Sequence, residues 1–435
     1  MLLKLVLFAQ ILHVVNQLHF KWTAGIPGIA PANLIFLAAL VLMRRKKETV
    51  IAKPILRNAI LFFYGALTFG FLWAEIRSPG VLLDDLTYYK NALFAPLFYF
   101  LFLKCRQDEK TTRWLIIWVL VVAAVAGLEG LREGFDYGFG TYNPFKRASG
   151  PFGDDWHMSN RAGVFYGMFM PMFVALVLFL RRQKLWQLAA LGGCIVTAGG
   201  AISTYSRQSY FLVLLATAVL LLRKSIVLTV AVSIACISLA GYLPESATQR
   251  VEETRQHGKA GAEDEDVDGS TSSRWHIWAG GMSMLASNPI GVGLHRWADE
   301  IGNFSGYKRI DAHNFYVLTL CECGPLGLAA LLYLIYTLFV LAKWVRANRP
   351  QNDLECTALT LGFTVCTLNV TLSGLYGSPT LEASVMAPYW ALCGLLERYI
   401  HLKMKNQGEA FKPEKAIDSM AKRFPLASYI VPGRK

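Results

Sequence analysis

The chain contains 435 residues, of which 54% are hydrophobic and 17% are charged, and its formal net charge at pH 7 is +13. A soluble globular domain carries about 25% charged residues, so this composition excludes an ordinary soluble protein. Apolar runs that approach the roughly 20 residues needed to cross a bilayer predict an all-α, polytopic membrane protein. The positive charge does not predict nucleic-acid binding, because no contiguous basic face occurs outside the C-terminal tail.

Twelve apolar segments predict membrane-spanning helices, within residues 1–243 and again within residues 314–402. The first segment could be a signal peptide, but no small-residue cleavage site precedes the polar sequence NQLHFKW, so we expect a retained helix. The expected spans lie at about 3–20, 28–43, 56–74, 88–104, 113–130, 162–180, 185–202, 206–222, 225–243, 314–342, 354–373 and 384–400.

The distribution of Lys and Arg predicts how the chain is oriented in the membrane. If the N-terminus is cytoplasmic, the segments on that side carry most of the basic residues, whereas the opposite side carries more acidic than basic residues. This is the positive-inside pattern. We therefore expect a long outer loop at residues 244–313 and a basic cytoplasmic tail at residues 403–435. Loops as long as the outer one are often functional.

The cysteines and the acidic residues give weak signals for metal binding. All eight cysteines avoid the expected outer loops, so no disulfide framework is predicted. Cys321 and Cys323 could be metal ligands, but small core residues are the favoured interpretation. The acidic run EDEDVD at residues 263–268 could attract a divalent cation, although a solvated segment is the commoner meaning of such a run. We predict no metal and no cofactor.

The second half of the outer loop contains a predicted helix. Ser272 or Ser273 can cap its start and Asn288-Pro289 ends it. Trp275, Trp278, Met282 and Leu285 form an apolar stripe, which is typical of a helix on the membrane surface or packed against the bundle. Arg274 would lie in the first turn, beside the positive pole of the helix dipole. A cation there is unfavourable unless an anion compensates it, so Arg274 is either an anion-binding residue or a solvated one.

The sequence STYSRQSY repeats this arrangement at the start of the span expected at 206–222. Arg207 falls in the first turn, after hydroxyl side chains that can cap the helix. Backbone N–H groups, hydroxyls and a guanidinium together favour an anion, above all a phosphate. The alternative is an arginine that extends to the lipid headgroups.

The span expected at 314–342 begins beside His313, with Asp311 and Asn314 as neighbours, and carries Glu322 nine residues further on. At about 100° per residue the two side chains lie on different faces of a helix, so His313 and Glu322 are not expected to form a dyad. We expect Glu322 to fix the helix to a neighbour through a buried hydrogen bond. Gly324 and Gly327 would permit the close contact.

An anion site and a histidine on the outer face restrict the chemistry that is possible there. Nucleotide-activated donors are cytoplasmic, so an activated donor must arrive within the membrane, as a lipid-linked diphosphate does. Stabilising the charge that grows on the departing diphosphate would assist the leaving group. A histidine with a pKa near 6.5 is suited to remove a proton from an acceptor hydroxyl at neutral pH.

Three stretches of the sequence resemble the O-antigen ligase and polymerase superfamily. AHNFYVLTLCECGPLG resembles its His-Asn…Glu-x-Gly-x-x-Gly signature, STYSRQSY its Ser-Arg segment, and KRASGPFGDDWHMSNRAG its Arg…Gly-x-Phe…Asn loop. In the third stretch the family's Pro-Asn pair is replaced by Ser159-Asn160. The matching positions are His313, Asn314, Glu322, Gly324 and Gly327, and Arg147, Gly150, Phe152 and Asn160.

This resemblance implies a metal-independent, inverting C-type glycosyltransferase in the bacterial inner membrane, with its site facing the periplasm. The donor would be a glycan on undecaprenyl diphosphate and the acceptor the lipid A–core oligosaccharide. His313 would be the general base, and Arg207, Arg274, Arg147 and Asn314 would bind substrate. We favour an O-antigen ligase; the alternatives are an O-antigen polymerase and a protein O-oligosaccharyltransferase. A transporter would also fit twelve spans, but the chain has no evident internal repeat.

Overall fold

The computed structural model describes residues 1–15, 30–44, 53–139, 143, 145–153, 158–181, 183–239 and 269–406. In this part of the chain the secondary structure is entirely helical, which confirms the predicted all-α class. Six helices, α3, α5, α6, α7, α14 and α15, are long and apolar enough to cross a membrane. The acidic run at 263–268 and most of the basic tail lie outside the described residues.

Every predicted span corresponds to a helix. The helices are α1 (Leu2–Val15), α2 (Pro31–Met43), α3 (Arg57–Arg77), α4 (Leu82–Leu103), α5 (Glu109–Asp136), α6 (Ser159–Phe179), α7 (Lys184–Ser203), α8 (Arg207–Lys224), α9 (Ile226–Leu239), α14 (Phe315–Ala347), α15 (Leu354–Ser373) and α16 (Ala383–Asn406). A short 3-10 turn, η1 (Gly150–Phe152), precedes α6, and another, η4 (Pro379–Leu381), precedes α16.

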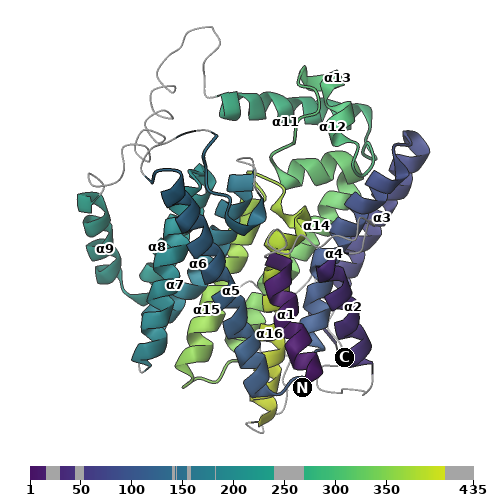
Figure 1. The fold of residues 1–435 in the computed structure, drawn as a ribbon. Coiled ribbons are helices and arrows are strands. Elements are labelled where there is room, and N and C mark those ends of the chain that lie inside the picture. The colour runs from purple at the N-terminus through teal and green to yellow at the C-terminus, as the bar shows by residue number, and fades with distance from the viewer. Residues whose placement is uncertain are drawn as a thin grey trace, which may run out of the picture.

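Two helices form the interior of the bundle. Every residue from Ala162 to Ala175 of α6 is buried, and so is every residue from Val385 to Ile400 of α16. A helix that is apolar on all sides is expected inside a bundle rather than at its lipid-facing surface. The other helices surround this pair (Figure 1).

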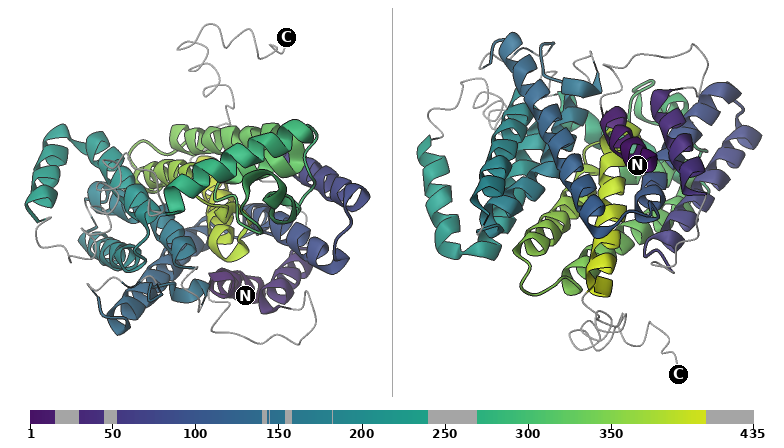
Figure 2. Two further views of the ribbon diagram at one scale, coloured as in Figure 1. Left: turned by 90° about the horizontal axis from the view of Figure 1, so that it is seen from above. Right: turned by 60° about the horizontal axis from the view of Figure 1, so that its bottom comes forward.

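The bundle has two ends, and one of them carries an additional layer. The helix α11 (Gly269–Ser287) lies across this end, together with the short helices α12 (Trp297–Glu300) and α13 (Gly302–Ser305) (Figures 1 and 2). We call this end the α11 face. Helices α6, α8 and α14 begin there, whereas Met1 and the last residues of α16 lie at the opposite end. That the α11 face is periplasmic remains a prediction.

The helix predicted in the outer loop is present, but two of its details differ from the prediction. It begins at Gly269 rather than after Ser272 or Ser273, so Arg274 lies in its second turn. Its buried residues include Ile277 and Met284, whereas Trp275 and Met282 of the predicted stripe are exposed. Packing of α11 against the segment before α14 selects the buried side, which the spacing of apolar residues alone could not identify.

The sequence CECGPLG breaks α14 near its start. Gly324 has a φ of 67° and a ψ of −170°, outside the helical region, and Pro325 has no N–H to donate. The break leaves carbonyl groups of α14 without helical partners, and a neighbouring loop supplies donors instead. Val292 N donates to Cys321 O and Gly293 N donates to Glu322 O, each at 2.9 Å. A Cβ on Gly324 would collide with the carbonyl of Ile290.

Glu322 forms the buried hydrogen bond that the sequence predicts. Its Oε1 accepts from the backbone N–H of Trp297 at 3.2 Å, and the residue is 3% exposed. The neighbour is the start of α12, not another spanning helix. Glu322 therefore fixes the loop at 288–297 against the break in α14, and that loop supports the α11 face from beneath.

Candidate functional site

His313 lies immediately before α14, in a strained backbone conformation. Its φ is 48°, which L-residues other than glycine adopt at a cost of about 1–3 kcal/mol. Its side chain is 39% exposed, and its Nδ1 is 3.7 Å from Oδ2 of Asp311. Strain of this kind persists only where the surroundings fix it, and it is frequent at functional sites.

Asn314 fixes the position of His313 by capping the helix. Its Oδ1 accepts from the backbone N–H groups of Tyr316 and Val317, at 3.0 and 3.1 Å. This is the preferred use of Asn before a first helical turn, and such a cap contributes about 1 kcal/mol. The predicted role of Asn314 in substrate binding is untested, and its carbonyl oxygen is already occupied by the cap.

The electrostatic surroundings of His313 favour its neutral form. Burial lowers the pKa of the imidazole below its usual value; the carboxylate of Asp311 raises that pKa, and the guanidinium of Arg274 lowers it further. The guanidinium of Arg274 is therefore close enough to His313 for its charge to act on the ring. At neutral pH the ring is uncharged and can accept a proton.

A hydrogen bond from a tryptophan joins α11, the helix that carries Arg274, to the segment before α14. Trp278, one turn further along α11, donates from Nε1 to the carbonyl of Ala312 at 2.8 Å. Trp275 packs edge to face on Trp278, with ring centroids 5.2 Å apart. The segment Asp311–His313 and α11 are thus joined directly, and Arg274 precedes this junction.

Arg207 is the first residue of α8, after the N-cap residue Ser206. The next residue, Gln208, donates from Nε2 to the carbonyl of Ser373 at 2.8 Å. The neighbouring carbonyl, that of Gly374, accepts from Phe315 N at 2.7 Å. The starts of α8 and α14 are therefore attached to the same end of α15, so Arg207 and His313 lie on one face, as predicted.

Arg147 has a different environment from the other two arginines. It is 8% exposed; its Nε donates to the carbonyl of Thr204 at 2.9 Å, and one terminal nitrogen donates to Oδ1 of Asn160 at 2.8 Å. It holds the turn between α7 and α8 against the start of α6. Arg147 therefore stabilises the turn that presents Arg207, and Asn160 participates through its carbonyl oxygen.

The sequence reasoning missed an ion pair beside this site. Arg161, in the first turn of α6, lies 2.8 Å from a carboxylate oxygen of Glu382. Burial raises the pKa of Glu382; Arg161 lowers it, and the charge of Asp311, two residues before His313, raises it further. Arg161 could have been found by the rule that selected Arg207, because both are arginines in the first turn of a helix on the α11 face.

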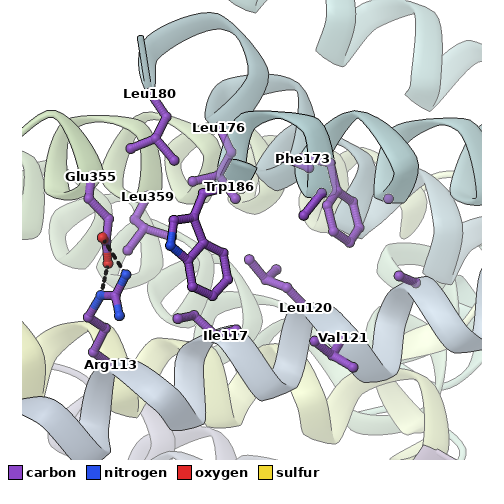
Figure 3. Close-up of a pocket in the computed structure, with 14 residues that line it drawn as sticks. Arg113, Ile117, Leu120, Val121, Phe173, Leu176, Leu180, Trp186, Glu355 and Leu359 are labelled. Atoms are coloured by element: carbon purple, nitrogen blue, oxygen red, sulfur yellow. Dashed lines mark hydrogen bonds and ion pairs between the residues drawn. The ribbon is translucent and has the colours of Figure 1, made fainter. Parts of the chain in front are cut away.

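A separate apolar cavity of about 120 Å³ lies between α5, α6, α7 and α15 (Figure 3). At the edge of the cavity, Arg113 donates two hydrogen bonds to the carboxylate of Glu355, and Trp186 projects into the cavity. Arg113 belongs to the start of α5 and Glu355 to the start of α15, which are at the end opposite the α11 face. This cavity is therefore not part of the arrangement around His313.

Comparison with known proteins finds a family match over part of the chain. Residues 192–332 match the family model described as O-Antigen ligase. The matched region contains Arg207, Arg274, His313 and Glu322, which are the residues that the structure places on or under the α11 face. No curated protein matches the chain. Residues 192–332 are therefore similar to the O-antigen ligase family, and this match supports the resemblance noted in the sequence.

Proposed function

We propose that the protein is an O-antigen ligase, which transfers O-antigen glycan from undecaprenyl diphosphate to the lipid A–core oligosaccharide. The observation that carries this proposal is the junction of α11 with the strained start of α14, where Trp278 donates to the carbonyl of Ala312 and the charge of Arg274 acts on His313, within the region that matches the family. A neutral imidazole beside a guanidinium is suited to deprotonate an acceptor while an anion departs next to it.

Arg207 and Arg274 bind the donor diphosphate in this account. The guanidinium group matches two phosphate oxygens at once and remains charged at every physiological pH. Both residues lie on the α11 face, where the aligned N–H groups at the starts of α6, α8 and α14 add partial positive charge. The polyprenyl chain of the donor would extend among the helices below this face.

The transfer is a single displacement at the anomeric carbon of the donor sugar. A hydroxyl oxygen of the acceptor forms the new glycosidic bond, and the bond from the anomeric carbon to the diphosphate oxygen breaks. The hydroxyl proton passes to His313, and undecaprenyl diphosphate leaves with the electron pair. Because attack and departure are on opposite sides, the anomeric configuration inverts.

The lipopolysaccharide of a strain that lacks the gene tests the proposal. A ligase predicts loss of the whole O-antigen ladder from lipid A–core while the lipid-linked polymer is retained. A polymerase predicts a single repeat unit on lipid A–core, and that pattern would replace the proposal. A normal ladder in a strain with no second copy of the gene would show that the protein is neither the ligase nor the polymerase.

A further inference from the structure

A second histidine on the α11 face, His295, has the more tightly organised environment of the two. It follows the sequence GVGL in the loop that supports α12, and its φ is 67°. Its Nδ1 lies 2.8 Å from Oδ1 of Asp85, at the start of α4, and its side chain is 41% exposed. Asp85 itself is 3% exposed.

The partners of Asp85 determine which nitrogen of His295 carries the proton. Arg296 donates from both terminal nitrogens to the two carboxylate oxygens of Asp85, each at 2.7 Å. These hydrogen bonds from Arg296, opposed by burial and assisted by His295, hold the pKa of Asp85 well below its usual range. An ionised carboxylate only accepts hydrogen bonds, so Nδ1 of His295 must donate. In the neutral ring Nε2 is then the acceptor.

Tyr88 fixes the plane of the His295 ring. The two rings are stacked, with centroids 4.4 Å apart and an angle of 17° between their planes. With one face covered by Tyr88 and Nδ1 bound to Asp85, the ring has one polar atom left for a ligand, Nε2. A side chain held in this way loses little entropy when it binds.

Anchoring the loop does not require a histidine at this position. Trp73 donates to the carbonyl of Gly291 at 2.9 Å, Arg77 donates to that of Val292 at 3.2 Å, and Arg296 binds Asp85 directly. Gly adopts a positive φ most readily, and Asn, Asp and His are the other frequent residues there, so the backbone conformation alone does not require histidine. What distinguishes His295 is that a buried ionised partner and a stacked ring fix its side chain, which leaves Nε2 as the atom available to a ligand.

The place of His295 in the fold indicates which ligand. Arg207, one of the two proposed donor-binding residues, lies on the α8 side of α14, whereas His295 and Asp85 lie on the side of α3 and α4 (Figure 1). His313 begins the helix between them. Because the donor diphosphate binds on the α8 side in this account, the side of α3 and α4 is the place for the acceptor.

We propose that Nε2 of His295 accepts a hydrogen bond from a hydroxyl group of the acceptor glycan, so that His295, Asp85 and Tyr88 form an acceptor subsite. This rests on the proposed glycan transfer. His295 is a substrate-binding residue in this arrangement, Asp85 positions its ring, and the proton removed in the reaction still passes to His313.

Steady-state kinetics of the purified full-length protein test the subsite. His295→Phe keeps a ring to stack on Tyr88 but removes both nitrogens. Loss of one hydrogen bond should raise the apparent KM for lipid A–core about tenfold, with kcat at saturating acceptor and the KM for the donor unchanged. His276→Phe is the matched control, because His276 is exposed on α11, and it should alter neither constant.

The opposite kinetic pattern would overturn the subsite. A fall in kcat at an unchanged acceptor KM would make His295 part of the chemical step, and unchanged constants would make it structural. If His295→Phe does not fold, His295→Asn serves instead: Asn tolerates the positive φ and can still donate to Asp85, but it lacks the reach of Nε2.

A binding measurement separates failure of the subsite from failure of the proposed function. In protein labelled with ¹⁵N-histidine, the His295 signals are identified by their absence from His295→Phe. The oligosaccharide released from lipid A–core should shift the Nε2 signal and leave His276 unchanged. A shift without any transfer would retain the subsite and reject the ligase reaction. Transfer by the wild type, with no shift at saturating oligosaccharide, would reject the subsite alone.

Discussion

Both ends of the bundle use buried arginines to join segments of the chain, but the α11 face also carries partly exposed arginines on the same face as His313. At the end opposite the α11 face, Arg398 is 1% exposed and donates to the carbonyl groups of Leu103 and Gln107, while Lys403 lies 3.0 Å from both Glu109 and Asp353. These contacts join helix ends. On the α11 face, Arg161, Arg207 and Arg274 are each partly exposed.

Backbone strain follows the same division. Among the described residues, the non-glycine residues with a positive φ on the α11 face are Tyr205, His295, Arg309 and His313, and at the opposite end there is Arg106. Tyr205 lies two residues before Arg207, and two of the strained residues are the histidines of the proposed site. The comparison teaches that charge alone does not distinguish a site from a structural contact, whereas the gathering of strained positions around His313 does set the α11 face apart.

The largest expected effect is on the arginines that we propose bind the donor. Arg274→Ala and Arg207→Ala should each reduce transfer about 10²–10³-fold, because each removes a group that stabilises the charge on the departing diphosphate. Lysine at either position should restore little activity, since it cannot make two parallel hydrogen bonds to phosphate. Transfer assays with purified protein at matched expression measure this. Wild-type rates in both alanine variants would place the diphosphate elsewhere.

A substitution at the break in α14 should reduce transfer nearly as much. Gly324→Ala places a Cβ against the carbonyl of Ile290 and forces a side chain into a positive φ. We expect a loss of about 3 kcal/mol or more in stability and loss of transfer together, because the loop that supports α12 is displaced. Thermal unfolding in detergent and a transfer assay report the two effects. Leu326→Ala, at an exposed position two residues away, is the control.

The opposite end should show a change in stability without a change in chemistry. Arg398→Met removes a buried guanidinium and leaves the carbonyl groups of Leu103 and Gln107 without their donor, at a cost of about 2–4 kcal/mol. The melting temperature should fall, while kcat per folded molecule stays at the wild-type value. A large loss of kcat in folded Arg398→Met would mean that the two ends are coupled and that the comparison is wrong.

The smallest expected effect is a shift of the pH profile. Because burial and Arg274 lower the pKa of His313, the base stays neutral to a more acidic pH than an exposed histidine would. Asp311 opposes this by raising that pKa. Asp311→Asn should therefore move the acid limb of kcat/KM for the acceptor to lower pH, and Arg274→Lys should move it little. A shift of that limb to higher pH in Asp311→Asn would contradict the assignment.

Hydropathy was sufficient to predict where the helices lie, because a helix that crosses a bilayer must be apolar over most of its length. Glu322 was also predictable, since a carboxyl group inside a helix requires a partner. Its partner, Trp297, was not, and neither was the pairing of Asp85 with His295. Those contacts join residues far apart in the sequence, and nothing local to either residue specifies them. The break at Gly324-Pro325 is visible in the sequence, but the loop that satisfies its carbonyl groups is not.

For the site residues, too, position could be predicted from the sequence but contacts could not. Arg207, Arg274 and His313 were found because each lies near the start of a helix on one face, which topology alone brings together. Arg147 matches a motif equally well, yet its guanidinium holds Thr204 and Asn160. A motif match therefore identifies a residue that matters, whereas its contacts decide how it acts.

Transfer by purified His313→Gln, measured beside donor binding, tests the central claim most directly. Glutamine keeps a side chain that can form hydrogen bonds but removes the basic nitrogen, and the arginines remain to hold the diphosphate. We predict normal folding, normal binding of the lipid-linked donor and a fall in transfer of about 10²–10⁴-fold. Transfer near the wild-type rate would show that His313 positions its neighbours and is not the general base.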